Sequence, residues 1–168
     1  MLSKKKMNGI AIFDKNCTWN KKGKISGTVK FHQCSPQNPT QVSIDLNMDN
    51  PDSTHALHIH EYANLLEGCM GAGGHYNPYN QTHGSVFVPE RERHVGDLRN
   101  NVTSDFEGKV VEEFSDELVT LYGPYSVFGR TLVIHSGIDD LGLGDNRESL
   151  ITGNAGDRIA CAVIGRAR

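Results

Sequence analysis

The chain has 168 residues and a formal net charge of −3, with 37% hydrophobic and 22% charged residues. This composition is that of an ordinary globular protein and argues against wholesale disorder. The length fits one domain, and a net charge so close to neutral argues against a nucleic-acid binder. Histidine occurs 8 times, more often than Phe, Pro or Tyr, and Gly occurs 18 times. The many glycines indicate turns, and the many histidines indicate metal ligands.

Apolar residues alternate with polar residues in much of the chain, as they do in strands with one buried face. In chain order, the predicted strands cover Gly9–Phe13, Ile25–Phe31, Val42–Met48, Ala56–His60, Leu118–Leu121, Thr131–His135 and Ile159–Ile164. The turn signal Asp105–Gly108, between Val102 and Val110, predicts a hairpin. About eight short strands separated by turns predict an all-β fold, an antiparallel sandwich or barrel.

The N-terminal segment carries charge rather than apolar residues. Met1–Gly9 contains Lys4, Lys5 and Lys6, and no apolar region follows, which argues against a secretory signal. No apolar run approaches the roughly 18 residues that a membrane-spanning helix needs. We therefore expect one domain over residues 1–168, with residues 1–8 as a flexible tail, and the cytoplasm as the compartment.

Two long stretches lack the alternation. Residues 62–98 and 136–157 are polar and rich in glycine. Segments of this length without regular structure are uncommon in a compact domain unless they are functional loops. Histidines and cysteines are the candidates for ordering them.

Histidines gather where strands meet these loops. His58 and His60 share one face of a strand, because residues i and i+2 project to the same side. An isolated His-x-His pair is more often a solvated strand face. Here further metal-ligating residues follow, namely His75, His83, His94, Asp97 and His135. The clustering favours a metal site over the solvated face.

Ligand chemistry divides these residues into two groups. Three histidines and one aspartate fill the tetrahedral coordination of a structural zinc, and the loop residues from His75 to Asp97 supply that set. The strand histidines remain for a second metal, and redox-active copper suits a nitrogen-rich site. Of the two other histidines, we interpret His32 as a surface residue and His55 as a hydrogen-bonded structural one.

Five motifs follow one another along the chain: His58-Ile-His-Glu61, Gly68-Cys-Met-Gly-Ala-Gly-Gly-His-Tyr-Asn-Pro78, Glu92-Arg-His-Val-Gly-Asp-Leu98, Gly129-Arg-Thr-Leu-Val-Ile-His135 and Gly153-Asn-Ala-Gly-Asp-Arg-Ile-Ala-Cys161. Together they resemble the Cu/Zn superoxide dismutase family, and the resemblance covers the chain from about Met7 to Ala167. It implies an eight-stranded Greek-key β-barrel, immunoglobulin-like, with two functional loops. It also implies dismutation of superoxide to dioxygen and hydrogen peroxide, with one copper and one zinc ion per subunit.

The same resemblance implies roles for particular residues. The copper ligands would be His58, His60, His75 and His135, and the zinc ligands His75, His83, His94 and Asp97. His75 would then bridge the two metals and take part in proton transfer. Arg158 would attract and orient the anionic substrate, since a guanidinium stays charged at working pH. Asp139 would join His60 to His83 by hydrogen bonds, and Thr152 would narrow the channel beside Arg158.

The resemblance further implies a disulfide between Cys69 and Cys161, whereas Cys17 and Cys34 are expected to be free thiols. It implies a homodimer, with contacts at Tyr62, Ala63, Phe128, Gly129, Val163 and Gly165. Arg166 stands where the family usually has an apolar contact residue. Arg147, Glu148 and Ile151 stand where many members have two acids and a lysine, which alters the field that guides superoxide.

Two other functions compete with catalysis. One is a non-catalytic relative, a copper-binding decoy or chaperone domain, but the implied copper ligands and Arg158 are all present. The other is an extracellular sandwich module, which the Asn-x-Thr sequons at Asn16, Asn80 and Asn101 support only weakly. The sequence does not decide whether a copper chaperone is a further partner.

Overall fold

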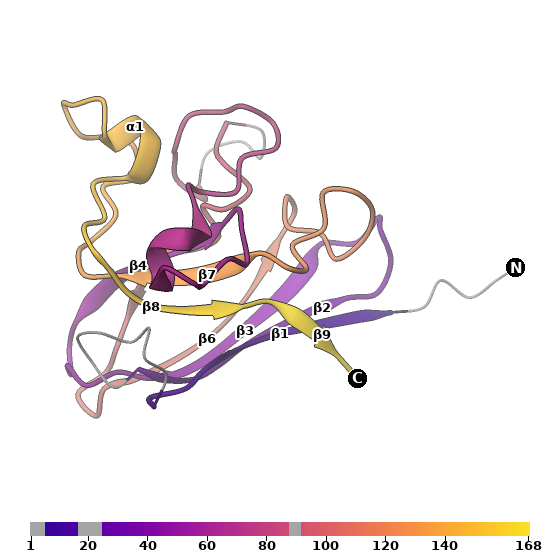
Figure 1. The fold of residues 1–168 in the computed structure, drawn as a ribbon, viewed down its shortest axis with the longest axis horizontal. Coiled ribbons are helices and arrows are strands. Elements are labelled where there is room, and N and C mark those ends of the chain that lie inside the picture. The colour runs from indigo at the N-terminus through magenta and orange to yellow at the C-terminus, as the bar shows by residue number, and fades with distance from the viewer. Residues whose placement is uncertain (1–5, 17–24, 88–91) are drawn as a thin grey trace, which may run out of the picture.

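Nine strands form two sheets in the computed structural model, which describes residues 6–16, 25–87 and 92–168 (Figure 1). The five-stranded sheet has the order β6-β3-β2-β1-β9, and the four-stranded sheet has the order β5-β4-β7-β8. The first contains β1 (Met7–Phe13), β2 (Ser26–Gln33), β3 (Thr40–Asn47), β6 (Lys109–Asp116) and β9 (Gly165–Ala167). The second contains β4 (Thr54–His60), β5 (Asn100–Thr103), β7 (Thr131–His135) and β8 (Arg158–Val163). Neighbouring strands pair antiparallel throughout, which confirms the predicted all-β fold class.

The core lies between the two sheets. Along β3 the alternation is strict: Val42, Ile44 and Leu46 are buried, while Gln41, Asp45 and Asn47 are exposed. Strands β4 and β7 differ, because residues 55–60 and 131–135 are buried on both faces. One face of these two strands belongs to the core, and the long loops cover the other (Figure 1).

The predicted hairpin around Asp105–Gly108 is wrong. The turn does form, with Gly108 N donating to Asp105 O at 2.9 Å, but the strands on either side belong to different sheets. Val102 pairs with His55 of β4, and Val110 pairs with Leu46 of β3. A turn signal marks the reversal of the chain without specifying its pairing partners, so the local pattern cannot separate a hairpin from a crossing between sheets.

The predicted strand Leu118–Leu121 is also wrong. Side chains satisfy backbone groups there in place of a neighbouring strand. Asp116 Oδ1 accepts from the N–H groups of Leu118 and Val119, both at 2.8 Å, and Gln33 Oε1 accepts from Leu121 N at 2.7 Å. Val119 and Leu121 are nevertheless buried in the core, which explains why their pattern resembled that of a strand.

Strand β1 begins at Met7, whereas the sequence predicted a strand from Gly9. Met7 and Asn8 pair with Gln33 and His32, so these two residues belong to β1 rather than to the tail. His32 is partly exposed at the surface, where its Nδ1 lies 2.7 Å from Asn8 Oδ1. Among the described residues Cys34 is a free, exposed cysteine, as predicted, whereas Cys17 lies outside them.

Covalent and ionic links fix the long loops on the sheets. Cys69, in the 3-10 helix η1 (Gly68–Ala72), forms a disulfide with Cys161 of β8. The buried Arg93 donates to Asp116 Oδ2 at 2.7 Å, which joins the first loop to the end of β6. The second loop contains the one-turn helix α1 (Ser149–Thr152). In the described ranges, no helix has the length and apolar character that crossing a membrane requires.

Candidate metal centre

Two paired strands and one loop bring four histidines together. His58 and His60 come from β4, His135 ends the neighbouring β7, and His75 reaches them from the first loop through a bridge to His60. All four are buried, and each offers a nitrogen that lies within 4.8 Å of the others. These are the residues implied as copper ligands, and the structure brings all of them together.

Hydrogen bonds set the tautomers of three of these rings. A backbone carbonyl can only accept, so His60 donates its Nδ1 proton to Gly73 O at 2.9 Å and His135 donates its Nδ1 proton to Gly156 O at 3.2 Å. His58 donates from Nε2 to the carboxylate of Asp139 at 2.7 Å. Each ring therefore directs a lone pair inward, from Nε2 of His60, Nε2 of His135 and Nδ1 of His58.

The inward nitrogens lack partners of the right kind. His60 Nε2 and His135 Nε2 face each other at 3.2 Å, although both carry lone pairs. His58 Nδ1 and His75 Nε2 are buried without a hydrogen-bond partner. Buried polar atoms are rarely left in this condition, because an unsatisfied group costs about 1–3 kcal/mol. A cation among the four nitrogens would satisfy all of them, and imidazole nitrogen is a ligand that suits copper.

Burial keeps these rings neutral. It lowers the pKa of His58 to about 3 and that of His135 to about 4, and it lowers the pKa of His60 well below its ordinary value. Nearby histidines add to the effect, as does Arg158 for His60. At neutral pH the lone pairs are therefore available to a metal ion without prior loss of a proton.

A second group of ligands surrounds Asp97. Its Oδ1 lies 2.9 Å from His75 Nδ1, 2.9 Å from His83 Nδ1 and 3.2 Å from His94 Nδ1. The N–H groups of Gly84 and His94 bind the other oxygen, Oδ2, at 3.1 and 3.0 Å, which fixes the carboxylate. Four ligands about 2.0–2.1 Å from a tetrahedral zinc lie about 3.3 Å from one another, so this set fits zinc.

By the distances between ligand atoms alone, His58 rather than His94 would join His75, His83 and Asp97. We prefer His94, because the Nε2 of His58 already donates to Asp139 and its Nδ1 belongs to the first group. His94 Nδ1, in contrast, lies 3.4 Å from His75 Nδ1 and faces Asp97. The four residues implied as zinc ligands are thus together, and His75 contributes one nitrogen to each group.

Asp139 joins the two groups, but not through the histidine that the resemblance suggested. Its Oδ2 accepts from His58 Nε2 at 2.7 Å and its Oδ1 accepts from His83 Nε2 at 2.8 Å. The predicted link to His60 is wrong, because His60 directs its proton to Gly73 O. Burial alone would lower the pKa of His83, but hydrogen bonds to Asp139 and Asp97 outweigh it and raise that pKa to about 9.

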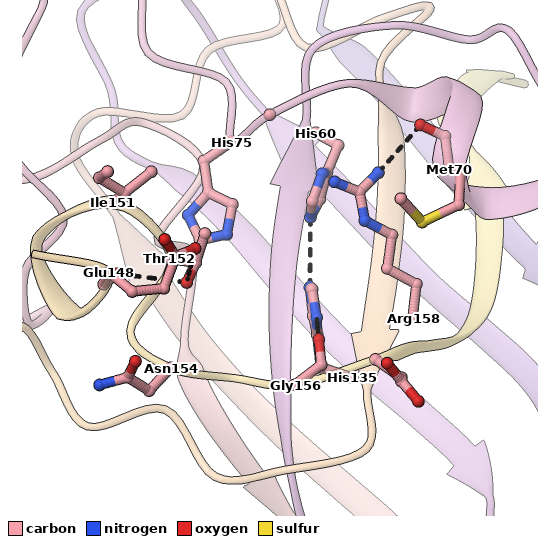
Figure 2. Close-up of a pocket in the computed structure, with 12 residues that line it drawn as sticks. His60, Met70, His75, His135, Glu148, Ile151, Thr152, Asn154, Gly156 and Arg158 are labelled. Carbon is pink, nitrogen blue, oxygen red and sulfur yellow. Dashed lines mark hydrogen bonds between the residues drawn. The ribbon is translucent and has the colours of Figure 1, made fainter.

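A cavity of about 460 Å³ opens above the first group (Figure 2). His60, His75 and His135 line it, together with Arg158, Thr152 and Ile151. Three carbonyls position the Arg158 guanidinium: Nη1 donates to Cys69 O at 2.8 Å and to Met70 O at 3.3 Å, and Nη2 donates to Gly73 O at 2.6 Å. Opposite, Thr152 Oγ1 donates to Glu148 Oε1 at 3.0 Å.

Sequence reasoning missed two supporting residues. Gly73 accepts protons from both His60 and Arg158 through one carbonyl, and Asn100 donates to Asp139 Oδ2 at 2.9 Å. A backbone carbonyl leaves no signal in the residue types. Asn100 lies in a run of polar residues that reads as an ordinary turn, so its role became visible only in the structure.

An antiparallel β-sandwich whose loops bury two adjoining sets of candidate metal ligands, with Arg158 in the cavity beside them, is the framework of a metalloprotein. Residues 25–164 match the family described as copper/zinc superoxide dismutase (SODC). The superoxide dismutase (Cu-Zn) of Saccharomyces cerevisiae is 49% identical over 141 residues, which are 84% of this chain and 90% of the relative. Those of Candida glabrata and Humicola lutea are 47% identical over 141 residues and 46% identical over 142 residues, with 84% of this chain and 90% and 91% of the relatives covered. The chain belongs to the copper/zinc superoxide dismutase family.

Proposed function

We propose that the chain catalyses the dismutation of superoxide to dioxygen and hydrogen peroxide. The observation that carries this proposal is the convergence of four histidine nitrogens, three of them from rings that line a cavity also containing Arg158. The family relatives, which bear the name superoxide dismutase (Cu-Zn), support it.

We assign one copper ion to His58, His60, His75 and His135, and one zinc ion to His75, His83, His94 and Asp97. The unpartnered atoms of the first group and the tetrahedral spacing of the second support this assignment. When bound, copper supplies the one-electron redox couple that dismutation needs, and zinc supplies fixed positive charge beside it.

Arg158 and His75 supply the remaining chemistry. The Arg158 guanidinium, fixed by its carbonyl partners, presents a permanent positive charge to an anion entering the cavity. Superoxide also needs protons to become hydrogen peroxide. We place one of them on His75 Nε2, which faces the cavity side of the site and has no hydrogen-bond partner in the protein. That nitrogen would carry the proton only while it does not hold copper. Its transfer to the reduced oxygen species would supply one of the two protons of hydrogen peroxide, and water entering the cavity would supply the other.

The decisive experiment combines metal analysis with activity. The purified protein, loaded with both metals, should contain one copper and one zinc per chain and should accelerate the decay of superoxide generated by pulse radiolysis. Chelation should remove the activity, and addition of both metals should restore it. A protein with both metals and no activity would contradict catalysis and would support the non-catalytic relative.

Replacing Ile151 by lysine should speed the capture of superoxide. Ile151 is 45% exposed and lines the cavity, where Glu148 and Asp157 oppose the single charge of Arg158. An added cation there should raise kcat/KM by about two- to tenfold at low ionic strength, and the gain should shrink as salt screens it. Rates measured across a salt series test this.

Ile138→Lys is the matched control for that change. Ile138 is 61% exposed in the same loop and does not line the cavity, yet its replacement alters the net charge equally. An equal gain in the two variants would mean that overall charge, rather than charge at the cavity, guides the substrate.

We also infer a homodimer of single-domain chains in the cytoplasm. The residues implied as dimer contacts support the dimer, since Tyr62 is 52% exposed and Ala63, Gly129 and Gly165 are exposed. Arg166 has a partner within its own chain, with its guanidinium 5.2 Å from the ring centroid of Phe128, so it needs none across the interface. Sedimentation equilibrium at micromolar concentration should give twice the chain mass, and a Gly165→Arg variant should give the monomer.

A further inference from the structure

Asn100 is a buried residue at the start of β5 whose side chain reaches the carboxylate between the two ligand groups. It is 1% exposed. Its Oδ1 accepts from Val86 N at 2.8 Å, and its Nδ2 donates to Gly84 O at 3.0 Å and to Asp139 Oδ2 at 2.9 Å. Both amide protons and the amide oxygen therefore have defined partners.

The backbone fixes the orientation of this amide. An N–H group can only donate and a carbonyl can only accept, so Val86 N requires Oδ1 on its side and Gly84 O requires Nδ2 on its side. Nδ2 must then face Asp139. Asn100 also has a φ of 57°, in the left-handed region that glycine and asparagine tolerate best. Asparagine is the residue that combines this backbone conformation with a donor directed at Asp139.

Position and orientation of Asp139 depend on different residues. Asn101 binds the backbone of Asp139, accepting from its N–H at 2.8 Å and donating to its carbonyl at 2.9 Å. Asn100 binds the side-chain oxygen that also accepts from His58 Nε2. Asn101 therefore holds the loop in place, whereas Asn100 limits rotation of the carboxylate together with the backbone N–H of Leu141, which donates to Asp139 Oδ1 at 2.7 Å.

We propose that Asn100 is a positioning residue for both ligand groups, because it holds the Asp139 carboxylate where His58 and His83 can donate to it from Nε2. With those protons fixed, the Nδ1 atom of each ring is directed at its metal group. This inference rests on the metal assignment of the proposed function, although it concerns metal retention rather than catalysis. Partners of metal ligands commonly change metal affinity by about 10–100-fold.

The test compares Asn100→Gly with the unchanged protein, both loaded with zinc and copper(I). Glycine keeps the left-handed backbone and removes the donor. We expect zinc to pass to an excess of chelator about tenfold faster. We also expect faster solvent exchange of the His58 and His83 Nε2 protons, observed by NMR. Neither readout depends on dismutation, so a chain that binds both metals without catalysis would leave this proposal standing.

Asn77→Gly is the matched control. Asn77 lies in the first loop, and its side chain bonds to the backbone of Gln81 in that loop, with Nδ2 donating to Gln81 O at 2.8 Å and Oδ1 accepting from Gln81 N at 3.0 Å. If loop order alone controls zinc release, this variant should release zinc as fast as Asn100→Gly, and that result would overturn the proposal. Asn100→Asp provides a second test, since it keeps the acceptor for Val86 and lacks the donor. Zinc release and imidazole proton exchange within twofold of the unchanged protein, in either Asn100 variant, would also overturn it.

Discussion

Replacing His135 by alanine is expected to abolish superoxide dismutation while zinc stays bound. His135 contributes its Nε2 atom to the first ligand group and takes no part in the group around Asp97. Without it, three nitrogens remain for copper, and the cavity loses one side of its floor. Metal analysis should show zinc at the wild-type level and weakly held copper, and superoxide decay after a radiolysis pulse should match that of buffer.

His32→Ala provides the control for this variant. His32 is partly buried and bonds to Asn8 and Cys34, far along the chain from either ligand group. We expect it to keep both metals and full activity. Full activity in His135→Ala would refute the copper assignment, because a site that works without this nitrogen is not the one described.

The fold was predictable where the pattern of burial is local. The period-two alternation at Val42, Ile44 and Leu46 located β3, because one face of that strand is buried and the other is exposed. It failed at Val119 and Leu121, which are buried but donate their backbone N–H groups to the side chains of Asp116 and Gln33 rather than to a neighbouring strand. Alternation of residue types does not record such partners. It also could not assign β5 and β6 to separate sheets, since sheet membership is set by strands far away in sequence.

For the candidate site, the sequence predicted which residues lie together but not how their rings are oriented. The motifs and the His-x-His spacing point to the residues that the structure brings together. Which histidine donates to Asp139 depends on where the other ring nitrogen finds an acceptor, and Gly73 O takes the proton of His60. That carbonyl belongs to the backbone of a glycine, whose residue type gives no sign of this role, so the sequence had no means of excluding His60.

Removing the disulfide should weaken both the fold and the reaction. The bond between Cys69 and Cys161 spans 92 positions, and the loop-entropy relation gives about 4–5 kcal/mol for a loop of that length. The double variant Cys69→Ser, Cys161→Ser should lose about this much free energy of unfolding. Urea titration of the metal-free protein is the right measurement, because bound metals add a binding free energy of their own.

The same variant should lose activity for a separate reason. Cys69 and Met70 carry two of the carbonyls that position Arg158, and the disulfide is what fixes their helix η1 to β8. Once η1 is released, the guanidinium should no longer be held in the cavity. The kcat/KM of the fully metal-loaded variant should then fall by about tenfold, within the range attributed to electrostatic guidance of a substrate. Cys34→Ser, which removes an exposed free thiol, should change stability by less than about 0.5 kcal/mol and leave the rate intact. A double variant that is destabilised yet fully active would show that Arg158 keeps its position without the disulfide.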